Sequence, residues 1–73
     1  MIKKPTQIKI NTDYITLGQF LKLADIIESG GEAKSFLAQN TVVIDSEPDN
    51  RRGRKLRGGE IVEVLDQKFE IKK

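Results

Sequence analysis

Four segments of this chain have the alternation or the composition of β-strands. They are residues 6–10, 42–44, 61–65 and 68–71. In the first, Ile8 and Ile10 alternate with polar residues, the period of a half-buried strand. The segment 42–44 is instead a continuous run of branched apolar residues, which favour extended backbone. The last two segments flank a short turn at residues 66–67, as in a hairpin.

Two other segments have the spacing of amphipathic helices. In the first, apolar residues recur three and four positions apart at Leu17, Phe20, Leu21 and Ala24. Leu23 and Ile27 are expected to extend this apolar surface towards the turn between the helices. A shorter stripe of Ala33, Phe36 and Leu37 ends near Asn40. Such stripes predict helices with one buried face.

Each predicted helix is preceded by the same start signal. Thr16 precedes Gln19 by three residues, and Ser29 precedes Glu32 by three. In a capping box, a hydroxyl and a side chain three residues later satisfy the free amides at a helix start. A connection of only a few residues then favours two neighbouring, packed helices. The pattern predicts an α+β fold in the order β-α-α-β-β-β, with the helices against a small, mostly antiparallel sheet.

Residues 45–59 show no periodicity, and they contain the densest cluster of basic residues in the chain. Residues 51–57, here called the basic loop, contain no acidic residue and hold five of the thirteen basic side chains. These five are Arg51, Arg52, Arg54, Lys55 and Arg57. The other sixty-six residues carry a net charge of −3. Long loops in small domains are often functional. Leu56 is expected to anchor the basic loop to the core, and Gly58-Gly59 to form a tight turn.

The charge of the basic loop suggests several kinds of partner. Arginine suits bidentate contact with phosphate, so a dense cluster is typical of nucleic-acid binding. Alternatives are a solvated loop that keeps the chain soluble, a surface that docks an acidic protein, or a site for duplex DNA.

The composition argues against several other classes of protein. The chain has neither cysteine nor histidine, so it lacks disulfides, thiolate ligands and the commonest general base. We therefore expect no enzyme, metal, cofactor or small-molecule substrate. The start of the chain, residues 1–5, is basic but is followed by no apolar segment typical of a signal peptide. We expect one small cytoplasmic domain over residues 1–73, without a membrane anchor.

The run from Ile15 to Leu65 resembles the RNA-binding domain named after small-subunit ribosomal protein S-four. Two short helices, an apolar strand, a polar turn and a basic loop ending in a Gly-acid pair follow one another in that order. The segments 16–22 and 51–61 are most similar to the small stand-alone YaaA-like proteins. The resemblance implies a family-like core at about residues 15–65, with an added N-terminal strand at 6–10 and a C-terminal strand at 68–71. It also implies binding of structured RNA, such as rRNA or tRNA, on a ribosomal subunit.

The sequence departs from the family pattern at the second helix. Gly30 stands where the family usually has arginine, which shifts the expected phosphate contacts towards the basic loop. The residues expected to contact RNA are Arg51, Arg52, Arg54, Lys55 and Arg57 in the loop, Ser29, Gly30 and Lys34 at the start of the second helix, and Lys22 on the first.

The aromatic residues refine the kind of RNA that is expected. Phe20, Phe36 and Phe69 lie on apolar stripes and are expected in the core, so we expect no exposed aromatic platform for unstacked bases. Arginines without aromatics favour structured RNA recognised through its phosphates, its shape and its 2′-hydroxyl groups.

Overall fold

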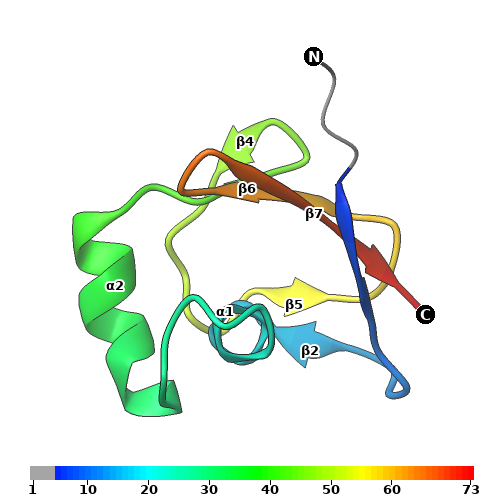
Figure 1. Ribbon diagram of the computed structural model, residues 1–73, viewed down its shortest axis with the longest axis horizontal. Coiled ribbons are helices and arrows are strands. Elements are labelled where there is room, and N and C mark those ends of the chain that lie inside the picture. The colour runs from blue at the N-terminus through cyan, green and yellow to red at the C-terminus, as the bar shows by residue number, and fades with distance from the viewer. Residues whose placement is uncertain (1–4) are drawn as a thin grey trace.

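A computed structural model describes residues 5–73 as two helices packed against two sheets (Figure 1). The helices are α1 (Leu17–Leu23) and α2 (Ala33–Gln39), and a 3₁₀ turn, η1 (Gly30–Glu32), precedes α2. The strands are β1 (Thr6–Lys9), β2 (Ile15–Thr16), β3 (Val43–Ile44), β4 (Glu47–Pro48), β5 (Lys55–Leu56), β6 (Ile61–Val64) and β7 (Gln67–Lys72). The first four residues of the basic start of the chain lie outside the described residues.

Five strands form the main sheet, in the order β1-β7-β6-β3-β4. The β6–β7, β3–β6 and β3–β4 pairs are antiparallel, and only β1 runs parallel to its neighbour β7. The remaining strands, β2 and β5, form an antiparallel pair of their own. The α+β fold with a mostly antiparallel sheet is confirmed.

The core fills the space between the main sheet, the helices and the β2–β5 pair. Figure 1 shows the main sheet on one side and α1, β2 and β5 on the other, with α2 at the edge of the molecule. Strand alternation sends Val62, Val64, Phe69 and Ile71 inward. The ring of Phe20 from α1 meets that of Phe69 edge-on, with centroids 5.2 Å apart, which ties the helix to the sheet.

The first helix ends earlier than its apolar stripe suggested. Its C-cap is Ala24, and Asp25 takes a left-handed φ of 62°, so the chain turns away after about two turns of helix. The prediction that Leu23 and Ile27 extend the buried face is therefore half wrong. Leu23 is 58% exposed, whereas Ile27 is buried by the turn itself.

The two predicted capping boxes have different outcomes. At Thr16 both reciprocal hydrogen bonds with Gln19 form, as predicted. At Ser29 the box is wrong, because the glycines after it form a 3₁₀ turn in which the Glu32 amide donates to the backbone oxygen of Ser29. The Ser29 hydroxyl contacts only the Glu32 side chain, at 3.4 Å, and α2 begins after Glu32.

The segment predicted as a structureless loop contains two short strands. The first, β4, forms a hairpin with β3 through Asp45 and Ser46, both at positive φ. The second, β5, lies inside the basic loop and pairs with β2, which the sequence pattern did not predict either. Phe36 also differs from expectation, since it is only half-buried against the core cluster.

Candidate nucleic-acid interface

The start of α1 holds the backbone of the basic loop in place. The amide of Leu17 donates to the carbonyl of Arg54 at 2.7 Å, and the amide of Gly18 donates to that of Arg52 at 3.0 Å. These are two of the amides that a helix start leaves without an intrahelical partner. Gly18 also permits the close approach, because a Cβ at this position would lie 3.1 Å from Cγ of Arg52. The loop backbone is therefore turned towards α1.

Leu56 fixes the other end of the basic loop, as predicted. It is fully buried and pairs across strands with Ile15, which is also buried. Since neighbouring residues of a strand point to opposite faces, Lys55 and Arg57 point outward, and both are exposed. The loop thus combines a docked backbone with exposed basic side chains.

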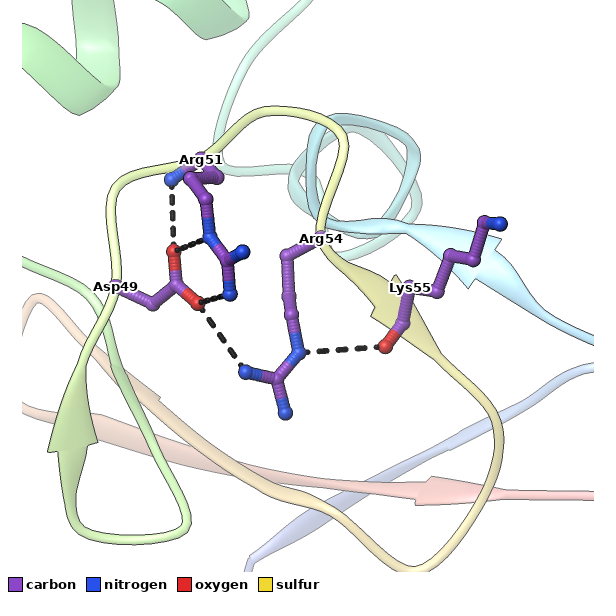
Figure 2. Close-up of polar contacts among 4 residues, drawn as sticks. All are labelled: Asp49, Arg51, Arg54 and Lys55. Carbon is purple, nitrogen blue, oxygen red and sulfur yellow. Dashed lines mark hydrogen bonds and ion pairs between the residues drawn. The ribbon is translucent and has the colours of Figure 1, made fainter.

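Asp49 organises two of the arginines, and the sequence analysis did not anticipate this role. Figure 2 shows its carboxylate between the guanidinium groups of Arg51 and Arg54. Arg51 donates to both carboxylate oxygens, at 3.1 and 2.8 Å, and its backbone amide donates to one of them at 2.9 Å. Arg54 donates to the carboxylate at 3.2 Å and, more weakly, to the carbonyl of Lys55 at 3.4 Å. An Asp two residues before an Arg was a signal for such a local turn.

These contacts change the electrostatics of the basic loop. The hydrogen bonds from the Arg51 side chain hold the pKa of Asp49 well below its usual range, against the opposing effect of burial. The Asp49 hydrogen bond in turn raises the pKa of Arg51. Arg51 and Arg54 therefore share one permanent negative charge. Within residues 5–73 no ion pair involves Arg52, Lys55 or Arg57.

A second carboxylate closes the loop at its far end. Glu60 accepts hydrogen bonds from the backbone amides of Arg57 and Gly58, each at 2.7 Å. Gly58 and Gly59 have φ values of 125° and 94°, which favour glycine. The chain bends here as expected, but the amide of Gly59 donates to the carbonyl of Ile71 at 2.7 Å, so the bend is held by β7 and is not a tight turn of its own. The Gly-acid pair is thus a structural clamp.

The other predicted contact residues lie around the loop at different distances. Lys34 from α2 and Arg52 together line a shallow hollow of about 350 Å³, beside Asn50. Neither Ser29 nor Gly30 lines this hollow, although both are exposed. Lys22 on α1 lines a different hollow. The structure therefore brings Lys34, but not Lys22, together with the basic loop.

Tyr14 is an exposed aromatic residue next to the basic loop. It is 40% exposed, and its ring has Lys55 Nζ at 5.1 Å and Arg57 Cζ at 5.5 Å from the centroid. The expectation of no exposed aromatic platform rested on the three phenylalanines and did not take the exposed Tyr14 into account. The contact depends on the pairing of β2 with β5, and the alternation of Tyr14-Ile15-Thr16 was its one sequence signal.

The described part of the chain, residues 5–73, offers neither a metal site nor a membrane-spanning helix. No group of three or more His, Cys, Asp or Glu residues is placed to hold a metal ion. No helix in this part of the chain has the length and apolar character to cross a membrane.

Comparison with known proteins identifies the family. Residues 8–72 match the family model described as "S4 domain". Over 57 residues the chain is 63% identical to the probable ribosome maturation protein RlbA of Bacillus subtilis (strain 168), an alignment that covers 78% of this chain and 80% of that protein. With the two helices, the mostly antiparallel sheet and the basic loop held by α1, these matches show that the chain belongs to the S4-domain family.

Proposed function

We propose that this protein binds structured RNA without catalysing a reaction, and that it does so in association with the ribosome. The RNA bound is rRNA or tRNA in this proposal. The protein acts in a process such as ribosome assembly or ribosome rescue. The relative named as a probable ribosome maturation protein supports the ribosomal context, since it is 63% identical over the aligned residues.

The observation that carries the proposal is the contrast between backbone and side chains in the basic loop. The carbonyls of Arg52 and Arg54 are used by the amides of α1, so the loop backbone is fixed before any ligand arrives. The side chains of Arg52, Lys55 and Arg57 are exposed and form no ion pair with the described residues. Because the loop backbone is already ordered, binding phosphates costs only the conformational entropy of these side chains.

The finer proposal assigns different roles to the residues of the interface. Arg52, Lys55, Arg57 and Lys34 each contact a phosphate directly, and Arg52 and Lys34 contact neighbouring phosphates beside the hollow that both line. Arg51 and Arg54 contribute mainly through the loop shape that Asp49 imposes, and add weaker contacts. Ser29, Gly30 and Lys22 are peripheral contacts in this proposal.

Single alanine variants test these roles against a matched control. We expect Arg52→Ala, Arg57→Ala and Lys34→Ala each to weaken RNA binding by about 1 kcal/mol, or about fivefold. Lys68→Ala removes the same charge from β7, where Lys68 lies 3.8 Å from Glu63, and should leave the affinity nearly unchanged. Gel-shift titration with rRNA and tRNA fragments measures the affinities, and circular dichroism checks the fold. If Lys68→Ala weakened binding as much as the loop variants, the interface would be misplaced.

Two further arms separate RNA binding from the alternative functions. Titration with duplex DNA and with an acidic polypeptide, at two salt concentrations each, tests the other partners for a basic surface. Tighter binding to either one than to structured RNA would contradict the proposal. Co-sedimentation of the protein with ribosomal subunits from a cell lysate tests the ribosomal context. We expect a variant in which Arg51, Arg52, Arg54 and Arg57 are all replaced by alanine no longer to co-sediment.

A further inference from the structure

The register of the β2–β5 pair explains why Tyr14 meets the basic loop. Ile15 pairs with Leu56 and Thr16 with Lys55, so continuing the register places Tyr14 opposite Arg57 and diagonal to Lys55. Ile15 and Leu56 point into the core, which leaves Tyr14, Lys55 and Arg57 together on the outer face. A hydrogen bond of 2.9 Å from the Thr12 hydroxyl to the Tyr14 carbonyl closes the turn before the strand.

Tyr14 also lines a hollow whose lining does not include Lys55 or Arg57. This Tyr14 hollow, of about 640 Å³, lies between the β1–β2 turn and α1. Its lining is apolar at Ile15 and at the exposed Leu23, and basic at Lys9 and Lys22. Tyr14 is thus shared between the basic loop and a hollow that combines apolar and cationic groups.

We propose that the Tyr14 hollow receives an unpaired base of the bound RNA, stacked on the Tyr14 ring, while Lys55 and Arg57 hold the adjoining phosphates. This inference rests on the proposed RNA binding and adds a base-binding subsite to it. Aromatic rings provide stacking surfaces for bases regardless of sequence, and unpaired nucleotides are the ones whose bases are free to stack.

The charges around the hollow, together with the ring of Tyr14, suit a nucleotide as the occupant, because a base can stack on the ring while the cations meet its phosphates. Lys9 and Lys22 at its rim, with Lys55 and Arg57 beyond Tyr14, are placed to meet the phosphates on either side of one base. The neighbouring acid, Asp13, is offset by Lys73 at 3.8 Å. Gln19 lines the hollow as well, and its amide nitrogen donates no hydrogen bond within residues 5–73, so it is available to a base edge.

Two RNA hairpins that differ only in unpaired nucleotides test the subsite. One carries a bulge of unpaired nucleotides in its stem, and the other has the same stem fully paired. Tyr14→Ala should weaken binding to the bulged hairpin by about 5- to 150-fold, the range for loss of one base–aromatic stack. Binding to the paired hairpin should be nearly unchanged. Tyr14→Phe keeps a stacking ring and should bind both hairpins as the parent does.

Intrinsic fluorescence provides a second, direct readout. The chain has one tyrosine and no tryptophan, so tyrosine emission comes from Tyr14 alone. We expect the bulged hairpin to quench this emission more strongly than the paired hairpin. Leu23→Ala, which truncates an exposed side chain that lines the hollow, should weaken only the bulged complex. Leu65→Ala truncates a similarly exposed apolar side chain elsewhere and should have no effect.

The outcomes separate this inference from the proposed function. If both hairpins bind but quench Tyr14 equally, and Tyr14→Ala affects both equally, there is no base subsite and RNA binding by the basic loop still stands. Loss of binding to the bulged hairpin by Tyr14→Phe as well would point to the hydroxyl group and would also overturn the stacking role. If neither hairpin binds the parent protein, the proposed function itself is wrong.

Discussion

Asp49 shows how one carboxylate can shape a basic surface. Its side chain is 9% exposed, and it accepts hydrogen bonds from the backbone and side chain of Arg51 and from Arg54. The side chain of Arg51 nevertheless remains 71% exposed, so water contacts the arginine side of this ion pair. The carboxylate therefore orders two long side chains and removes one unit of positive charge from the loop.

Replacing Asp49 by Asn tests this role through the pH dependence of stability. The pKa of Asp49 is lowered in the folded state, so its contribution is fully present above the unfolded value, near 3.8, and is lost as pH falls towards the folded pKa. At neutral pH we expect Asp49→Asn to lower the free energy of unfolding by about 1 kcal/mol, or the Tm by about 4–8 °C. The difference from the parent protein should shrink as the pH falls from 5 to 2. Urea midpoints measured across this range check it, and a constant difference would show that the charge of Asp49 does not stabilise the fold.

At the scale of elements, the helices and strands of four or more residues were predicted well from the sequence, and the two-residue strands were not. The helical stripes and the alternation in β1, β6 and β7 extend over four or more residues, so the core residues Phe20 and Phe69 were identified. The two-residue strands β2 and β5 are too short for alternation alone to identify them, because each forms only through its pairing with a distant segment. The contacts of Tyr14 with the loop were missed for the same reason.

Local motifs were reliable only where the surrounding backbone fits them. Thr16 comes from the end of β2 with extended dihedrals, φ −87° and ψ 161°, and there the capping box forms. Ser29 is also extended, but the two glycines after it form a tighter turn, so the same motif fails. The sites at Asp49 and Glu60 required the folded loop, since their partners are set by turns rather than by spacing along a helix.

The packing of α1 on the sheet leads to a prediction about stability. Phe20 is fully buried, with its ring against Phe69, so Phe20→Ala should cost about 3–5 kcal/mol. Phe36 on α2 is only half-buried, and Phe36→Ala should cost clearly less. In a domain of this size the first loss is comparable with the whole free energy of folding. Thermal melts compare the two variants, and equal losses would mean that α2 packs as tightly as α1.

At the scale of the whole molecule, charge is concentrated on one part of an otherwise acidic chain. The basic loop carries five positive charges, and the remaining residues a net charge of −3. The two acids that flank the loop, Asp49 and Glu60, are engaged in holding its shape. Binding through such a surface should depend on phosphates more than on base identity, apart from the nucleotide in the Tyr14 hollow.

The salt dependence of RNA affinity measures how many phosphates this surface engages. Contacts by Arg52, Lys55, Arg57 and Lys34 release the counterions of about four phosphates, which predicts a slope of log K against log salt of about −3 to −3.6. Arg52→Ala should flatten the slope by slightly less than one unit, since it removes one contact, and should weaken all structured RNAs alike. Tyr14→Ala should leave the slope unchanged even where it lowers affinity, because stacking releases no counterions. Filter binding between 50 and 200 mM salt, about the range in which such slopes are resolved, provides the measurement. A slope near zero would mean that the cations of the basic loop do not drive binding, and a flattened slope in Tyr14→Ala would mean that the ring acts by positioning Lys55 and Arg57.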